Sequence, residues 1–413
     1  MKERDYYLAF ALVNGIGPKT FAKLIANLGS AKKAWLSDAK ELKKAGLGEK
    51  LIQRFEKFRK EFSFEEHKNK LAQKEASFIA LCDKEYPKLL SQIPNPPIVL
   101  FVKGDPSILW DTVVARQSRF SDDARQTSTK LLKQARSLNE SLSLSLTNKA
   151  LTAFDSPQSE QTPLIAIVGT RKITNYGREV TKLFSSELSL SGVTIVSGLA
   201  MGVDAEAAWG ALHAGGKTIA VLGNGVDMCF PSSNRALYDK ILKGNGCIVS
   251  EFPLGQSPTV GSFPSRNRII AGLSLGVLVT EGAKDSGSLI TADYAFKFNR
   301  KVFAVPGPIT SQLSVAPLRL IEKGAKLVAS TEDILKELNF KYSKAKTDSK
   351  GVRLRNLSKD ELKIVQLLEN EGLFFDEIVR QSGISAAKLA TLLSMMEIKG
   401  IIKSSGNGIY STL

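Results

Sequence analysis

The sequence has few of the residues from which metal centres and disulfide frameworks are built. Its 413 residues include 3 cysteines and 2 histidines. Cys82, Cys229 and Cys247 form no C-x-x-C pair, and the histidines are His67 and His213. This pattern fits a reducing cytosol, excludes a cysteine-built zinc site, and leaves little material for a histidine-based metal site or triad. We therefore expect a cytoplasmic protein without a bound metal.

Long apolar runs are also missing. No run approaches the roughly 20 residues that a membrane-spanning helix needs. The apolar stretch of residues 6–13 leads into Asn14-Gly15 without a small-residue cleavage site, so we expect no signal peptide and no membrane partner.

Acidic residues are outnumbered. The chain has 57 lysines and arginines against 41 aspartates and glutamates, which gives a formal net charge of +16. The excess is spread over segments that are predicted to fold rather than gathered in a tail. It therefore favours a polyanionic partner.

What the sequence does have is a series of short β-branched runs that each end in glycine. They are residues 164–169, 193–198, 217–223, 276–282 and 301–307. Segments with helical periodicity lie between them, which is typical of a parallel sheet buried on both faces. The predicted fold class is α/β, with an extended Rossmann-like sheet that binds its ligand at the carboxyl ends of the strands.

Residues 1–75 are predicted to be helical, with two glycine-containing turns. Gly15-Ile16-Gly17-Pro18-Lys19 and Gly46-Leu47-Gly48-Glu49-Lys50 each place an apolar residue between two glycines. This is the helix-hairpin-helix pattern, in which backbone N–H groups can approach a phosphate closely. The predicted fold of this segment is a helix-hairpin-helix or SAM-like helical domain. The alternative to phosphate binding is a small helical packing or protein-contact domain that merely keeps the turns.

Three further segments complete the predicted domain organisation. Residues 76–340 are predicted to form the Rossmann-like, ligand-binding domain, with an apolar strand at 98–102 near one edge of the sheet. Within it, the serine-rich residues 106–163 are interpreted as an insertion with little material for a core. Residues 341–356 are a basic linker.

Residues 357–413 are predicted to form a winged helix of three helices and a hairpin. The exposed face of its third helix offers Lys388 and Thr391, but no arginine, asparagine or glutamine for bidentate contacts with bases. We therefore favour contact with protein, or weak contact with a DNA backbone, over base reading.

The obvious cofactor motifs fail. Residues 211–218 end like a phosphate-binding loop, but Ala211 stands at its first glycine and the segment leads from helix into strand. Gly223-Asn224-Gly225 begins a dinucleotide fingerprint, but Met228 stands where the third glycine belongs. We expect no cofactor.

The predicted rim of the sheet instead collects cations and hydroxyl groups. Arg171 follows the first glycine-ended strand, Arg266 and Arg268 open one helix, and Ser286-Gly287-Ser288 opens the next. With an aromatic residue such as Phe263 or Phe230, these groups suit single-stranded nucleic acid. The alternative is that Arg268 forms a structural pair and Phe263 belongs to the core.

Six motifs in this order resemble the DprA/Smf family of DNA-processing proteins of natural transformation. They are Val168-Gly169-Thr170-Arg171, residues 197–204, 216–225, Ser250-Glu251-Phe252-Pro253, 263–273 and 286–292. The resemblance also covers residues 86–105, the helical N-terminus and the winged helix.

The resemblance implies a homodimer that binds and protects incoming single-stranded DNA and loads the recombinase RecA, with single-strand-binding protein as a further partner to test. It implies no catalytic residues. Together with the chemistry of the rim, it predicts DNA contacts at Gly169, Thr170, Arg171, Ser197, Gly198, Lys217, Phe263, Arg266, Asn267, Arg268, Ser286, Gly287 and Ser288. Arg171 is the leading phosphate contact.

Two departures from the family pattern stand out. Val260 occupies a place where relatives often carry a basic residue, three positions before Phe263. Residues 311–318 replace the usual Gly-Cys/Thr-Asn run. One DNA contact is therefore expected to be missing, and dimer and RecA contacts cannot be assigned to particular residues.

The sequence is compatible with two other functions. The first is a nucleotide-processing enzyme that splits nucleoside monophosphates at the glycosidic bond. Glu281 and Asp285 would be its acids, and Ser286-Gly287-Ser288 would hold the phosphate. The second is a regulator that reads duplex DNA through the winged helix.

Overall fold

The computed structural model describes residues 1–110, 162–340, 357–368, 371–398, 401–405 and 408–412. It divides into two compact units, Met1–Tyr342 and Ser343–Leu413. Most of the predicted insertion and the whole predicted linker at 341–356 lie outside the described residues. The described start of the insertion holds a short 3₁₀ helix, η1 (Pro106–Leu109).

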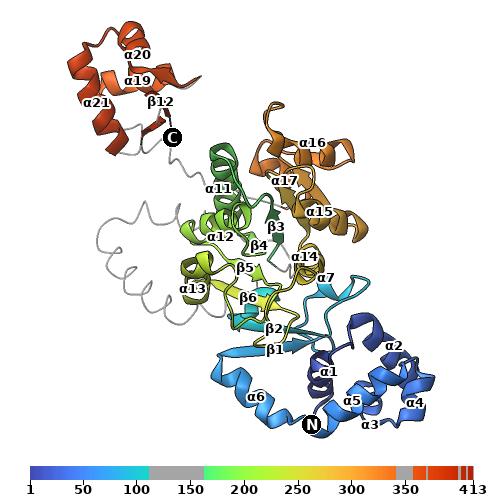
Figure 1. Ribbon diagram of the computed structural model, residues 1–413. Coiled ribbons are helices and arrows are strands. Elements are labelled where there is room, and N and C mark those ends of the chain that lie inside the picture. The colour runs from blue at the N-terminus through green and yellow to red at the C-terminus, as the bar shows by residue number, and fades with distance from the viewer. Residues whose placement is uncertain (111–161, 341–356, 369–370, 399–400, 406–407, 413) are drawn as a thin grey trace, which may run out of the picture. The chain divides into compact units, whose positions relative to one another are not determined.

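A nine-stranded sheet forms the centre of the first unit (Figure 1), in the order β1-β2-β6-β5-β4-β3-β7-β8-β9. The neighbours from β6 to β9 are parallel, whereas β2 is antiparallel to both β1 and β6. The predicted α/β class and Rossmann-like sheet are confirmed. The strands are β1 (Ala76–Ala80), β2 (Val99–Gly104), β3 (Leu164–Val168), β4 (Thr194–Ser197), β5 (Thr218–Val221), β6 (Gly246–Ser250), β7 (Gly276–Val279), β8 (Lys301–Ala304) and β9 (Lys326–Leu327).

Two strands were not predicted. β1 is exposed or only partly buried over its first three residues, and Ser77 interrupts its apolar pattern. β6 is fully buried, but only Cys247, Ile248 and Val249 are apolar beyond glycine, which makes its run too short to stand out. Because β1 occupies the edge, β2 lies one strand further in than expected.

Helices cover both faces of the sheet. Along β3, Leu164, Ala166 and Val168 pack in one hydrophobic core, and Ile165 and Ile167 pack in another. This alternation follows from the two-residue period of a strand. The first core also contains residues of α7 (Lys88–Ser91), α14 (Ser262–Leu273), α15 (Gly287–Lys297) and α16 (Val315–Glu322), and the second contains residues of α11 (Asn175–Leu190), α12 (Val203–His213) and α17 (Thr331–Glu337).

The connections between strands fix where a ligand site can lie. From β3 the chain runs through α11, α12 and α13 (Arg235–Lys243) to strands on one side. After β6 it returns through α14 to β7 on the other side of β3. β3 and β7 are neighbours whose connections leave in opposite directions, which defines a topological switch point.

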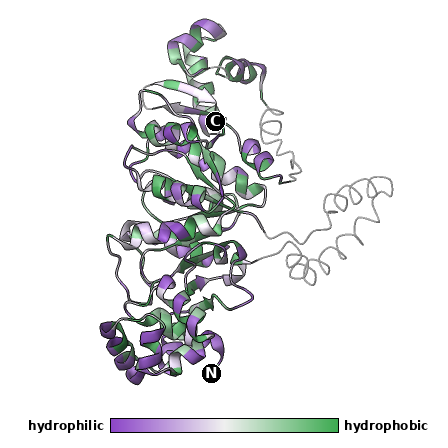
Figure 2. Ribbon diagram, turned by 90° about the vertical axis from the view of Figure 1, so that its right-hand side faces the viewer, coloured by the Kyte–Doolittle hydropathy of each residue, from purple (hydrophilic) through white to green (hydrophobic). Residues whose placement is uncertain are grey.

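The N-terminal segment forms six helices that pack on the sheet. The predicted helical character of this segment is confirmed. In Figure 2 these helices alternate between hydrophobic and hydrophilic colour, as expected for elements with one buried face. One core joins them to β1, β2 and α13, so they belong to the same compact unit. The helices are α1 (Glu3–Leu12), α2 (Pro18–Leu28), α3 (Ala31–Leu36), α4 (Ala39–Lys44), α5 (Glu49–Glu61) and α6 (Phe64–Gln73).

The second unit is a winged helix. Three helices precede a hairpin, and a two-residue strand that was not predicted completes a sheet in the order β10-β12-β11. Leu389, Leu393 and Met396 bury one face of the third helix. The elements are α19 (Lys359–Leu368), β10 (Leu373–Phe374), α20 (Phe375–Ser382), α21 (Ala386–Ile398), β11 (Ile402–Ser405) and β12 (Ile409–Thr412).

Candidate nucleic-acid interface

A cleft of about 630 Å³ opens at the switch point between β3 and β7. Its walls are the loop after β3, the loop that leads from β7 into α15, and the first turns of α14. Nine of the thirteen predicted contact residues line it: Gly169, Thr170, Arg171, Phe263, Arg266, Asn267, Ser286, Gly287 and Ser288. Sequence segments more than 100 residues apart therefore meet in one place.

Close backbone packing fixes the loop after β3. The Thr170 N–H donates to the Glu281 carbonyl at 2.8 Å, and the Val203 N–H donates to the Thr170 carbonyl at 3.1 Å. Gly202 has φ +78°, and a Cβ there would lie 2.3 Å from the Thr170 oxygen. Because only glycine fits this approach, the loop that carries Arg171 is held rigidly.

Arg171 presents its charge at the surface of the cleft. Its side chain is exposed, and its guanidinium carbon lies 5.5 Å from the centre of the Phe263 ring. Within the described part of the chain it forms no ion pair. An exposed arginine without an acidic partner is suited to bind an anion.

Two aromatic rings extend this surface. Phe263 is half-buried in the wall of the cleft rather than part of the core, so that alternative was wrong. Its ring centre lies 5.8 Å from that of Phe230, which is 45% exposed. Asn234 Nδ2 steadies the Phe230 loop by donating to the Leu199 carbonyl at 2.9 Å. Arg171, Phe263 and Phe230 thus form a row of one cation and two rings, which suits phosphate and bases.

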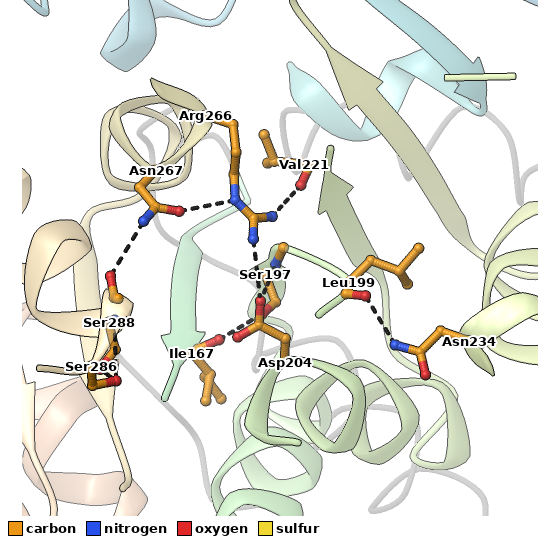
Figure 3. Close-up of polar contacts among 12 residues, drawn as sticks. Ile167, Ser197, Leu199, Asp204, Val221, Asn234, Arg266, Asn267, Ser286 and Ser288 are labelled. Atoms are coloured by element: carbon orange, nitrogen blue, oxygen red, sulfur yellow. Dashed lines mark hydrogen bonds and ion pairs between the residues drawn. The ribbon is translucent and has the colours of Figure 1, made fainter. Parts of the chain in front are cut away.

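The floor of the cleft is a hydrogen-bonded network (Figure 3). Arg266 Nη1 donates to the Val221 carbonyl at 2.5 Å, and Arg266 Nε donates to Asn267 Oδ1 at 2.9 Å. Arg266 Nη2 lies 3.8 Å from Asp204 Oδ2, and both side chains are buried. The hydrogen-bonding capacity of Arg266 is thus used largely within the fold.

Electrostatics distinguishes this floor from the mouth of the cleft. Burial raises the pKa of the Asp204 carboxyl above its ordinary value, against the opposing effect of Arg266. Burial also lowers the pKa of the Arg266 guanidinium, and the nearby positive charge of Arg171 adds to that effect. Since Asp204 faces Arg266, the charge of Arg171 remains for a ligand.

Ser197 and Gly198 support the floor from below. Ser197 Oγ is buried and donates to the Ile167 carbonyl at 2.7 Å, and the Gly198 N–H donates to Asp204 Oδ2 at 3.0 Å. A Cβ at Gly198 would lie 1.7 Å from Arg266 Nη1. These two residues therefore position Arg266 and Asp204, and neither lines the cleft.

The start of α15 forms the opposite wall. Asn267 Nδ2 donates to the Gly287 carbonyl at 3.3 Å, and the hydroxyl groups of Ser286 and Ser288 lie 2.8 Å apart. Ser286 caps the helix through the Ser288 N–H. The N-terminus of α15 thus faces the same cleft as Arg171, which adds favourable dipoles for an anion.

Two predicted contacts lie elsewhere. Lys217 precedes the first residue of β5, at the amino end of the strand, whereas the cleft lies at the carboxyl ends. Arg268 is buried, pairs with Glu251, and lines a different cleft. The structure thus shows Arg268 in an ion pair, as the structural alternative for this residue predicted.

Val260 stands at the mouth of the cleft with 91% of its side chain exposed. It thus occupies a position from which a basic side chain could reach a ligand, as the family pattern implied.

The acids of the enzyme alternative do not meet here. Asp285 lines the cleft, but Glu281 is buried and accepts hydrogen bonds from the Thr174 N–H at 3.0 Å and hydroxyl at 2.5 Å.

Sequence reasoning missed Asp204 as a functional residue. It appeared only as the last residue of a family motif, because nothing in its neighbourhood indicates a buried partner. Pairing with Arg266, 62 positions later, is a tertiary contact that periodicity cannot predict.

Among the described residues, no group of three or more His, Cys, Asp or Glu side chains could hold a metal ion, and no helix is long and apolar enough to cross a membrane.

Comparison with known proteins matches this architecture. The family described as DNA recombination-mediator protein A matches residues 77–139 and 149–339, and the DprA winged helix domain matches residues 350–408. Protein Smf of Synechocystis sp. is 36% identical over 342 residues, which are 81% of this chain and 73% of the relative. DNA processing protein DprA of Bacillus subtilis is 35% identical over 268 residues, 64% of this chain and 73% of that protein. The X-ray structure of DprA from Streptococcus pneumoniae superposes with a TM-score of 0.61 at 29% identity, covering 82% of this chain and 99% of that one.

Proposed function

This chain belongs to the DNA recombination-mediator protein A family, also called DprA/Smf, and from that premise we propose that it binds single-stranded DNA and loads RecA on it. In this role it protects incoming strands during natural transformation. It acts as a binding protein, without a catalytic step of its own.

One observation carries the proposal. Arg171 is exposed at the switch-point cleft, lies over Phe263, and has no acidic partner among the described residues. A cation on a rigid loop supplies affinity for a phosphate, and the row of rings supplies stacking for bases of any sequence. Stacking requires unpaired bases, so the site favours single strands over duplexes.

The proposed partners follow from the family. We propose RecA as the recombinase that receives the strand, a homodimer as the assembled form, and single-strand-binding protein as a further partner. The cytoplasm is the proposed compartment, since the three cysteines Cys82, Cys229 and Cys247 are all free thiols.

A direct test compares one labelled oligonucleotide as a single strand and as a duplex by fluorescence anisotropy at several salt concentrations. We expect tighter binding of the single strand and a steep loss of affinity with salt, because phosphate contacts release counterions. Equal or tighter binding of the duplex would contradict the proposal. RecA-driven strand exchange on DNA coated with single-strand-binding protein then tests loading, which the protein should accelerate.

A further inference from the structure

A second cleft of about 810 Å³ lies on the other side of α14. One wall is the turn Gly15-Ile16-Gly17-Pro18-Lys19 between α1 and α2. The other wall includes Glu251, Ser265 and Arg268 from the Rossmann-like part. The helical segment and the sheet thus build this cleft together, and the proposed function does not use it.

The turn in this cleft is fixed in place. Ile16 is buried, and its N–H donates to the Val13 carbonyl at 3.0 Å. Arg54 Nη1 donates to the Asn14 carbonyl at 3.0 Å. A Cβ built on Gly17 would meet no atom within 4 Å, so the space beside this backbone is open. A ligand can therefore approach the backbone closely without rearranging it.

The start of α2 is electropositive. The helix has 11 residues, Gly17 provides no side-chain cap, and its first turn contains no acidic residue. Lys19 is exposed and forms no ion pair within the described part of the chain. Backbone N–H groups, the helix dipole and one lysine thus point to an anionic ligand.

Arg268 provides an independent observation on the facing wall. It is only 8% exposed, and its Nη2 is paired with Glu251. Its Nη1 has no hydrogen-bond partner among the described residues. A buried charged donor without an acceptor is costly, so the fold satisfies the positive charge on this wall only in part, through Glu251.

The remaining lining residues suit unpaired nucleotides. Asn95 and Gln256 carry amide groups, and Phe252 and Tyr294 carry aromatic rings. Amides can hydrogen-bond to base edges, and rings can stack on base faces. The wall therefore offers more than a phosphate site.

We propose that this second cleft holds a further stretch of the same single strand, an inference that rests on the proposed function. Pro264 and Arg266 line the first cleft, whereas Ser265 and Arg268 line the second, so the first turns of α14 separate the two. A helix is about 10 Å wide, so a strand must be a few nucleotides longer to reach both clefts than to fill one.

The experiment uses the full chain and oligothymidylates of about 5 and about 20 nucleotides, a range that spans one and several binding sites. Lys19→Glu should leave the affinity for the short strand within about twofold. It should lower the affinity for the long strand roughly five- to tenfold at low salt. Lys40→Glu is the control, because this exposed lysine makes the same charge change on α4 without lining either cleft.

The outcomes separate this inference from the function on which it rests. A selective loss for the long strand with Lys19→Glu supports the second cleft. The inference is overturned if Lys19→Glu changes neither strand, affects both strands equally, or matches Lys40→Glu. The short strand with Arg171→Ala tests the first cleft alone, so unchanged affinity there would sink the proposed function instead.

Discussion

The switch-point cleft and the third helix of the winged helix each carry a basic residue on a surface where DNA could bind. The two residues differ in whether an acidic side chain neutralises their charge. In the cleft, the exposed Arg171 lies over an aromatic ring and has no acidic partner among the described residues. On the winged helix, Lys388 Nζ lies 2.5 Å from Asp360 Oδ2, and the Thr391 hydroxyl donates to the Ala387 carbonyl. A net positive charge therefore says less about binding than does the number of cations that the chain leaves unneutralised.

The same distinction operates inside the cleft. Arg266 is buried and interacts with Asp204, Asn267 and the Val221 carbonyl, whereas Arg171 is open to solvent. Removing a partner of Arg266 should therefore harm the fold, and removing Arg171 should harm binding. Both effects can be measured separately.

The largest expected effect is on stability. Asp204→Ala leaves the buried Arg266 charge without its acid and should lower the free energy of unfolding by about 3–5 kcal/mol. Denaturant titration of the full chain measures it. The control Asp239→Ala removes an exposed acid from Arg235 and should cost less than about 1 kcal/mol. If the two variants were equally stable, the floor of the cleft would not depend on this pair.

The next effect is on binding. Arg171→Ala should weaken single-strand binding by about 1.5–3 kcal/mol, the scale of a charge-assisted hydrogen bond, while the free energy of unfolding stays nearly unchanged. The logarithmic salt dependence should also become shallower by roughly 0.7, for one lost phosphate contact. Arg178→Ala is a matched control, because Arg178 is already paired with Glu206 at 3.0 Å. Equal losses in both variants would show that only overall charge matters.

The sequence predicted the sheet and much of the cleft because both depend on local pattern. Glycine-ended apolar runs placed Gly169, Arg171 and Ser286 at the carboxyl ends of strands, and the α/β topology brought these ends together. Charge type alone could not separate Arg171 from Arg268. Their roles differ because Glu251, 17 residues from Arg268 in the chain, faces it in the fold.

Lys217 shows a second limit. It precedes a strand of the same sheet as the cleft residues. In a parallel sheet, residues that precede strands and residues that follow strands lie at opposite ends of the strands. Strands β1 and β6 were missed because Ser77 interrupts the apolar pattern of β1 and the apolar run of β6 is only three residues long, although pairing with β2 stabilises both. Tertiary pairing decided these cases, and local propensity did not.

The smallest expected effect belongs to the winged helix. Lys388→Ala in the full chain should change single-strand affinity by less than about 0.5 kcal/mol, since its charge is already compensated by Asp360. Anisotropy with the strand used for Arg171→Ala gives a direct comparison. A loss as large as that of Arg171→Ala would place DNA on the winged helix and erase the contrast between the two regions.

Asp360→Ala sharpens the same contrast from the other side. Removing this acid releases Lys388, so the third helix of the winged helix should then resemble the cleft in having an uncompensated cation. Affinity for DNA should rise slightly at low salt, by up to about 0.5 kcal/mol, and the gain should vanish at high salt because surface charges are screened. In the double variant Asp360→Ala/Lys388→Ala the gain should be absent, since there is then no lysine to release. A gain that survives in the double variant would show that Asp360 repels DNA by its own charge and that the release of Lys388 does not explain the gain.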